Sequence, residues 1–229
     1  KKSYEKELLI INKFSDKSKD ALDVGVYRGV YSYKLSQNFK NIHSFEPNPL
    51  LYPYLEKNLI KIISNIKLYN LALSNENGVT DLKLPLRTKS IFKDNIEELF
   101  KLGAATMHPN NKIDNYKKVP VKMKKLDDIE IKNKIGLIKI DVEGHERNVL
   151  QGGIETVKNN KPVLLVEIEE RHTKIPITET INFIKSIGYK GFISKENDLI
   201  EIDKVSDLKK ENNFFFLPLD HKLIQSSGQ

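Results

Sequence analysis

Four ionisable side chains directly follow an apolar run in the stretch IGLIKIDVEGHERNVLQGG, residues 135–153. They are Asp141, Glu143, His145 and Glu146. Carboxylates and imidazoles can accept a proton, orient a substrate or bind a cation. A buried strand that ends in so much charge indicates a functional site, in which about two of the four groups act and the others cap the next helix or stay solvated.

A second acidic group follows the apolar run PVLLV, in the sequence EIEERHTK of residues 167–174. Strand alternation puts Glu167 and Glu169 on the same side, a pairing too polar for a core face. The alternative is a solvated acidic turn. Together with Asp141 and Glu143, these acids could hold a divalent cation through oxygen ligands. Nothing in the sequence fixes such a geometry, so we assign no metal ligand.

The sequence ALDVGVYRGVYSYKL, residues 21–35, indicates a ligand loop between a strand and a helix. Gly25 and Gly29 allow a tight turn and close approach of a ligand, although a short glycine loop alone is a weak signal. It is not a dinucleotide fingerprint, because Tyr27 and Val30 stand where glycines are required. Asp23 would repel a pyrophosphate but attract a cationic group, such as the α-amino group of S-adenosylmethionine.

Glu46, in SFEPNP, follows Asp23 by 23 positions and should end the second strand. A carboxylate there can accept both hydroxyls of a ribose. The alternative is an acid that caps a helix, followed by a turn proline, Pro47. After the third strand, Asn70 and Ala72 stand where an adenine would lie, which is the least specific of the cofactor signals.

The elements that position these residues form an alternating pattern of β-rich runs and helical segments, which predicts a parallel sheet with helices on both faces. The predicted strands are ALDVGV, NIHSFEP, IKLYNLALS, GLIKIDV, PVLLVEIE, YKGFIS and a closing FFFLP. The predicted helices are Tyr31–Asn38, Leu50–Ile62, Glu146–Lys158 and Ile177–Ile187. Residues 85–119 interrupt this pattern and are a lid or binding insertion, or else a surface excursion. We expect a single domain over 1–220 and a tail over 221–229.

Composition restricts the class of protein. A chain of 229 residues suits one well-buried α/β domain. It has no cysteine, which excludes disulfides, thiolate metal ligands and a cysteine nucleophile. No run is long enough for a membrane span, so we expect a cytoplasmic enzyme. The net charge of +7 comes from scattered lysines, so no nucleic-acid partner is expected.

The chain resembles FkbM-type S-adenosylmethionine-dependent methyltransferases. The matching pieces are DVGVYRGVYS, SFEPNP, NLALSNENG, VPVKMKKLDDI, IKIDVEGHERNVLQGG, KPVLLVEIE and SIGYKGF, which cover about residues 21–192. The resemblance implies a Rossmann-like, doubly wound, mostly parallel sheet of the methyltransferase type, with an insertion after the third or fourth strand. It also implies methylation of hydroxyls on sugars or polyketide-type products.

The resemblance to the family implies cofactor-binding roles for Asp23, Gly25, Gly29, Glu46 and Asp141. Our full cofactor set adds Val26, Arg28, Pro47, Asn70 and Ala72. The chain departs from the family at Val26-Tyr27-Arg28, where a smaller, more polar Ala-Asn pair is often found.

We therefore expect methyl transfer to a hydroxyl of a sugar in a surface glycan or secondary metabolite. His172 is the preferred general base and His145 the alternative, with Glu169 or Asp141 as the orienting carboxylate. Arg87, Glu143 and Arg171 are the predicted substrate-binding residues. Two other functions stay open. One is a catalytically silent cofactor- or glycan-binding module, and the other is a nucleic-acid methyltransferase, although DVEG replaces the motif of base-directed amino methylation.

The four arginines, Arg28, Arg87, Arg147 and Arg171, all fall near these predicted loops. Arginine binds carboxylate or phosphate through two parallel hydrogen bonds. One hypothesis is that at least two arginines line the acceptor pocket and that the acceptor is anionic. The alternative is that they pair with neighbouring glutamates to hold the loops.

Overall fold

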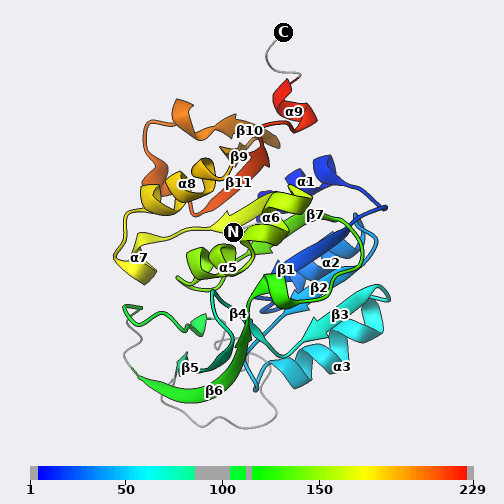
Figure 1. The fold of residues 1–229 in the computed structure, drawn as a ribbon, viewed down its shortest axis with the longest axis vertical. Helices are drawn as coiled ribbons and strands as arrows, with labels where there is room; N and C mark the ends of the chain where they lie inside the picture. Colours follow the sequence, from blue (N-terminus) through cyan, green and yellow to red (C-terminus); the bar gives the residue numbers. More distant parts are fainter. Residues whose placement is uncertain (1–4, 86–103, 112–114, 226–229) are drawn as a thin grey trace.

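The computed structural model describes residues 5–85, 104–111 and 115–225. Its elements are arranged as a central sheet with helices on both sides and a small second sheet (Figure 1). The strands are β1 (Asp20–Val24), β2 (Ile42–Phe45), β3 (Ile66–Tyr69), β4 (Ala72–Leu73), β5 (Gly78–Pro85), β6 (Tyr116–Lys124), β7 (Ile135–Ile140), β8 (Val163–Glu167), β9 (Tyr189–Lys195), β10 (Asp198–Glu201) and β11 (Asn213–Pro218). The α-helices are α1 (Glu7–Ile10), α2 (Val30–Ser36), α3 (Tyr52–Ile62), α5 (Glu146–Gly152), α6 (Ile154–Asn160), α7 (Glu170–Thr173), α8 (Ile177–Ser186) and α9 (Lys222–Gln225).

The central sheet has the strand order β10-β9-β11-β8-β7-β1-β2-β3. The five strands from β8 to β3 are parallel. The chain runs outward from β1 to β3 and then returns to β7 on the other side of β1. The carboxyl ends of β1 and β7 therefore lie at the switch in strand order, where open α/β sheets bind ligands.

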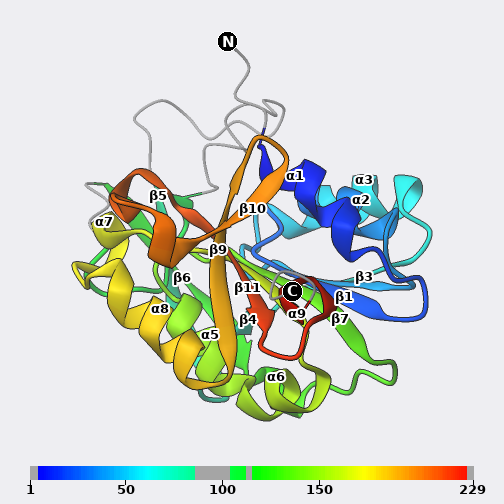
Figure 2. The same ribbon diagram turned by 90° about the horizontal axis from the view of Figure 1, so that it is seen from above.

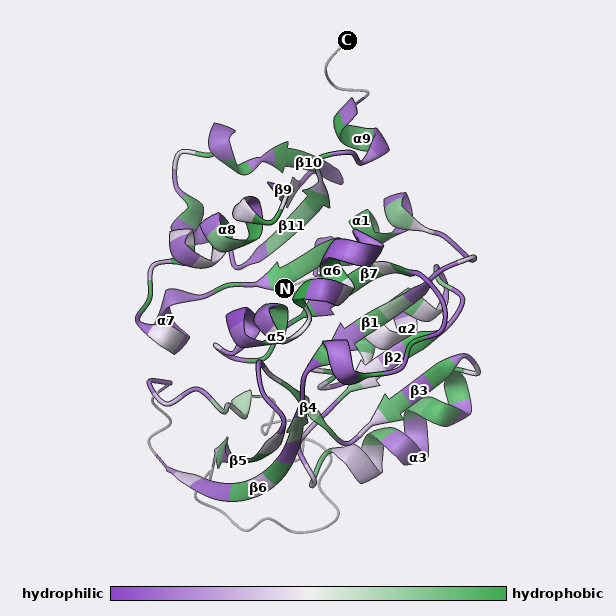
Figure 3. Cartoon of the chain, viewed as in Figure 1, coloured by the Kyte–Doolittle hydropathy of each residue, from purple (hydrophilic) through white to green (hydrophobic). Residues whose placement is uncertain are grey.

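Helices cover both faces of this sheet (Figure 2). One face packs against α5, α6 and α8, through a core that includes Ile138, Val149 and Ile181. The other packs against α1 and α2, with Ile10, Leu35 and Leu137 buried. The buried strand β11, for example, is coloured mostly as hydrophobic (Figure 3). This confirms the predicted doubly wound, mostly parallel fold.

The structure differs from the expected elements in several places. The last strand, β11, does not close the sheet but lies antiparallel between β8 and β9. The predicted helix after β7 is broken into α5 and α6, because Gly153 between them leaves the helical conformation with φ −118° and ψ 19°. The expected tail begins with α9, in which Ile224 packs against the core.

The small sheet has the order β4-β6-β5. It arises where the predicted third strand splits into β3 and β4, so that β4 pairs with β6 instead of β2. β5 and β6 flank the predicted insertion and pair antiparallel. Of the predicted lid, residues 85, 104–111 and 115–119 are described, and its amphipathic piece IFKDNIEELFKL lies outside the described residues.

Candidate functional site

A cavity of about 380 Å³ opens at the carboxyl ends of the parallel strands. Each strand end contributes to its wall: Gly25 follows β1, Glu46 follows β2, Asp141 follows β7, and Glu167 ends β8. The small sheet and the insertion close another side through Leu82 of β5 and Met107. The volume falls in the range of small-molecule and cofactor sites.

Glu46 lies at the β2 side of the cavity and is 7% exposed. One carboxylate oxygen accepts the backbone N–H of Tyr27 at 3.1 Å, and the other accepts that of Asn48 at 2.9 Å. Burial raises the pKa of Glu46 to about 7. Each carboxylate oxygen keeps a second lone pair. The residue is therefore held in place while it can still accept two hydroxyls, which fits a ribose.

The glycine loop after β1 is packed directly on the end of β7. Gly25 has φ +87°, and an added Cβ would lie 1.8 Å from the Asp141 carbonyl oxygen. Tyr27 has φ +50°, a region that a bulky side chain rarely adopts. Tyr27 lines the cavity, although it was not among the predicted site residues. Glycine at position 25 is thus required by the close approach of two strand ends.

Asp23 is fully buried beneath this loop. The Ser32 hydroxyl donates to its Oδ2 at 2.6 Å, while Oδ1 has no hydrogen-bond partner within the described part of the chain. Burial raises the pKa of Asp23, against the opposing effects of Lys139 and Ser32. Asp23 is not among the described residues that line the cavity. A direct contact with the cofactor therefore stays a prediction.

Lys139 was not predicted as a site residue, yet its ammonium lies inside this site. Its side chain is 3% exposed, and Nζ is 2.9 Å from Asp141 Oδ2 and 3.3 Å from the Gly25 carbonyl oxygen. Burial opposes its charge, but Asp141 and Asp23 outweigh that effect and raise the pKa of Lys139. The sequence feature that could have identified Lys139 is its position between two isoleucines, in a strand that is otherwise apolar.

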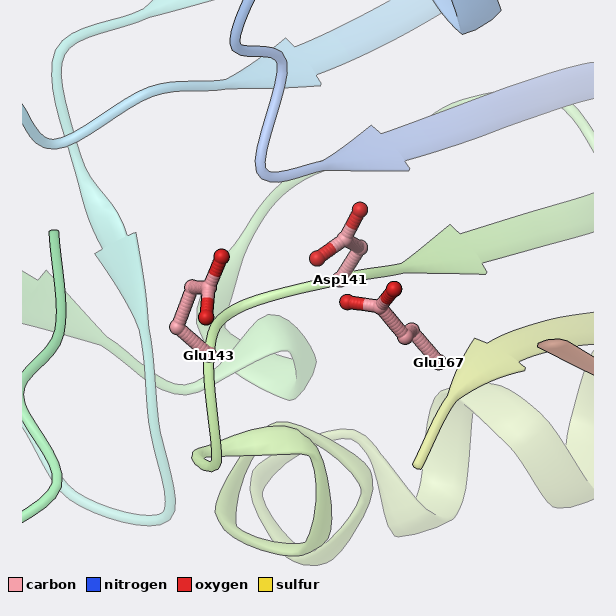
Figure 4. Close-up of side chains that lie close together, drawn as sticks. All are labelled: Asp141, Glu143 and Glu167. Atoms are coloured by element: carbon pink, nitrogen blue, oxygen red, sulfur yellow. The ribbon is translucent and has the colours of Figure 1, made fainter. Parts of the chain in front are cut away.

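Three carboxylates converge at the β7 and β8 side of the cavity (Figure 4). Asp141, Glu143 and Glu167 offer oxygens that all lie within 4.8 Å of one another, a spacing that could also hold a divalent cation. Burial and the neighbouring Asp141 raise the pKa of Glu167 to about 9. Burial acts the same way on Asp141, but Lys139 and a hydrogen bond from Glu167 lower its pKa. At neutral pH, Glu167 is therefore the neutral partner and donates to ionised Asp141.

The loop that carries Glu143 is strained and firmly held. Glu143 has φ +55° and Gly144 has φ +102°. The buried Glu146 carboxylate accepts the N–H of Val142 at 3.1 Å and of Gly144 at 3.0 Å. From the insertion, Thr106 donates its hydroxyl to the Glu143 carbonyl at 2.7 Å. Glu146, one of the four ionisable residues that follow the apolar run of β7, is thus a structural support of this loop.

The two candidate histidines lie behind the carboxylates. His172 is 6% exposed, with Nε2 at 3.0 Å from Glu143 Oε2 and 3.6 Å from Glu169 Oε2. His145 contacts the Ser74 hydroxyl at 2.9 Å, and burial lowers its pKa to about 4. Neither histidine is found in the described cavity lining. His172 contacts Glu143, which itself lines the cavity.

The other predicted residues are distributed over the site and its surroundings. Pro47 and Ala72 line the cavity. The Asn70 side chain donates to the Glu46 carbonyl at 2.9 Å, so it supports the β2 loop. Val26 and Gly29 instead contact side chains of the α3 core.

The arginines give no support to an anionic acceptor. Arg171 lines the cavity but is bonded to Glu169. Arg147 pairs with Glu179 at 3.6 Å. Arg28 lies over the Tyr27 ring, and Arg87 falls outside the described residues. The described lining holds five acidic side chains, from Glu5, Glu46, Asp141, Glu143 and Glu167, against the single guanidinium of Arg171.

Solved structures of methyltransferases share this fold. A methyltransferase FkbM from Methylobacillus flagellatus is 16% identical with a TM-score of 0.51, over 87% of this chain and 44% of that one, so our chain spans less than half of its length. A putative methyltransferase from Streptococcus mutans in complex with SAH is 11% identical with a TM-score of 0.50, over 95% and 98% of the two chains. An rRNA methylase from Streptococcus thermophilus is 10% identical with a TM-score of 0.49, over 93% and 92%.

At these identities the likenesses to the methyltransferase FkbM and to the Streptococcus mutans protein show the fold alone. A search of curated proteins found no significant match. Sequence comparison is more specific, because the methyltransferase FkbM domain matches residues 23–191, which hold all the strand-end groups described above. The chain belongs to the FkbM family of S-adenosylmethionine-dependent methyltransferases.

Proposed function

We propose that this protein transfers the methyl group of S-adenosylmethionine to a hydroxyl of a sugar, in a glycan or a secondary metabolite. The observation that carries the proposal is the placement of Glu143. It faces the cavity among carboxylates, on the side opposite Glu46, and His172 lies directly behind it. When bound, the cofactor supplies a methyl group already activated on a sulfonium.

In this proposal Glu143 is the general base. The acceptor oxygen would form a bond to the methyl carbon as the bond from that carbon to the cofactor's sulfur breaks, which would leave S-adenosylhomocysteine. The proton of the acceptor hydroxyl would pass to a Glu143 carboxylate oxygen. His172, at 3.0 Å from Glu143 Oε2, orients that carboxylate. Our preferred base from the sequence, His172, thus takes a supporting role. The neighbouring Glu167 lines the same side of the cavity and can accept a hydrogen bond from a further hydroxyl, which suits a polyhydroxylated acceptor.

Transfer of a radiolabelled methyl group from S-adenosylmethionine would test this function. Neutral oligosaccharides, sugar nucleotides and total RNA would be offered in parallel. We expect label on a saccharide, and Glu143→Gln should abolish transfer while S-adenosylhomocysteine still binds. Glu155→Gln, which changes an exposed glutamate of α6, is the matched control.

Other outcomes would favour the alternatives. Cofactor binding without transfer to any acceptor would indicate a silent module. Label on RNA, with binding that weakens steeply as salt rises, would indicate a nucleic-acid methyltransferase.

Two further expectations belong to this proposal. The insertion at 85–119 would act as a lid over the acceptor, supported by the contacts of Thr106 and Met107 at the cavity. A cytoplasmic location would place the enzyme with its cofactor. Within the described residues, no helix has the length and apolar character that a bilayer crossing requires.

A further inference from the structure

Lys139 is a buried cation that contacts two residues of the cavity wall and that the proposed reaction does not use. It lies on β7, two residues before Asp141, and its side chain is 3% exposed. Nζ contacts Asp141 Oδ2 at 2.9 Å and the Gly25 carbonyl oxygen at 3.3 Å, and it lies 4.8 Å from the centre of the Tyr31 ring. A fully buried lysine is costly unless it is paired, so such a residue needs an explanation.

The contacts of Lys139 join the two central strand ends of the sheet. Gly25 follows β1 and Asp141 follows β7, and both line the cavity. Lys139 itself is not among the described lining residues, so it acts only through its neighbours. Without its charge, the buried carboxyls of Asp23 and Asp141 would face each other uncompensated.

We infer that Lys139 is a positioning residue for the cofactor. Its ammonium holds the Gly25 carbonyl and the Asp141 carboxylate next to each other, and these two groups would accept hydrogen bonds from the cationic end of the bound cofactor. A carbonyl and a carboxylate are suitable acceptors for an ammonium group such as the α-amino group of S-adenosylmethionine. The inference rests on cofactor binding and not on the identity of the acceptor.

Binding of S-adenosylhomocysteine, measured by isothermal titration calorimetry, tests this role without any acceptor. Lys139→Met removes the charge and keeps the length of the side chain. We expect it to weaken binding about tenfold or more, as for a lost charge-assisted contact. Lys139→Arg keeps the charge and should recover most of the affinity. Lys134→Met, at an exposed lysine just before β7, should bind like the wild type.

A double-mutant cycle with Asp141→Asn separates positioning from a general effect on stability. If Lys139 acts through Asp141, Lys139→Met should cause little further loss of affinity in the Asp141→Asn background. If Lys139→Met fails to fold, the double variant replaces it, because both charges are then removed. Its affinity for S-adenosylhomocysteine is compared with the affinities of Asp141→Asn and Lys139→Arg.

Three results would overturn the inference. The first is a Lys139→Met variant that binds S-adenosylhomocysteine with wild-type affinity. The second is a double-mutant cycle in which the losses of affinity are fully additive. The third is an equal loss of affinity in Lys139→Met and Lys139→Arg that parallels the loss in their melting temperatures. Failure of the wild type to bind the ligand at all would instead contradict the cofactor assignment, which keeps the two failures distinguishable.

Discussion

Glu46 and Asp23 end neighbouring parallel strands, but their side chains have different surroundings. Glu46 reaches the cavity, whereas Asp23 is fully buried and bonded to Ser32. A buried carboxyl without a ligand contact contributes to folding more than to binding. Replacing the two residues should therefore have separable effects on affinity and on stability.

Glu46→Ala should weaken binding of S-adenosylhomocysteine by about 1.5–3 kcal/mol, the cost of a lost charge-assisted hydrogen bond. The protein should remain folded. The backbone N–H groups of Tyr27 and Asn48, which donate to Glu46, lie next to the cavity and can be solvated when the carboxylate is removed. Calorimetric titration with S-adenosylhomocysteine measures the affinity of this variant and of Glu76→Ala, a control that changes an exposed glutamate. Equal affinities in the two variants would remove Glu46 from the cofactor site.

Asp23→Ala should instead lower the free energy of unfolding by about 1–3 kcal/mol, because it leaves buried polar partners unsatisfied. Asp23→Asn keeps an acceptor for the Ser32 hydroxyl and should lose less. Urea unfolding at pH 7 compares the two. If Asp23→Ala were as stable as the wild type but bound the cofactor poorly, the direct contact predicted from the sequence would be supported.

At the scale of elements, the site depends on contacts between the insertion and the loop after β7. Thr106 is fully buried, and its hydroxyl donates to the Glu143 carbonyl at 2.7 Å and accepts the His108 N–H at 3.0 Å. Asn111 donates to the same carbonyl at 3.1 Å. These bonds hold the positive φ of Glu143, and with it the carboxylate that we propose as the base.

Thr106→Val should loosen this loop while it preserves the shape of the side chain. Losing two hydrogen bonds should cost about 1–3 kcal/mol of stability. Hydrogen exchange of the amides from 142 to 145 should become faster, since local opening is easier. Thr106→Ser, which keeps the hydroxyl, is the control. Equal exchange in both variants would show that the insertion does not hold the loop.

At the scale of the whole molecule, the sequence was sufficient for the fold, the family and the cofactor, and all three predictions are confirmed. Strands such as GLIKIDV are almost wholly apolar, so their place in a buried sheet is a local property. β5 and β6 were missed because lysines, a proline and an aspartate occupy their exposed face, which weakens the strand pattern.

The roles of individual groups were less predictable, because they depend on contacts between distant segments. Lys139 matters only because β7 lies beside β1, which brings the Gly25 carbonyl within reach. His172 lies behind Glu143 only because the loop after β7 takes its strained path. Residue types and spacing therefore located the site but did not distinguish its cavity-facing carboxylates from the groups that support them.

The proton held between Asp141 and Glu167 should appear in the pH dependence of folding. Burial and Asp141 raise the pKa of Glu167 from an ordinary value of 4.5 to about 9. Between these values the folded protein binds more protons than the unfolded chain, so this group lowers the stability as pH rises.

Glu167→Gln removes the titration and keeps a hydrogen-bond donor for Asp141. We therefore expect the variant to gain stability relative to the wild type steadily from pH 5.5 to pH 8.5 in urea unfolding. Glu46 and Glu146, whose pKa values burial raises to about 7, are present in both proteins and cancel in the difference. Parallel stability curves for the two proteins would show that Glu167 is ionised across this range, and that Asp141 and Glu167 do not share a proton.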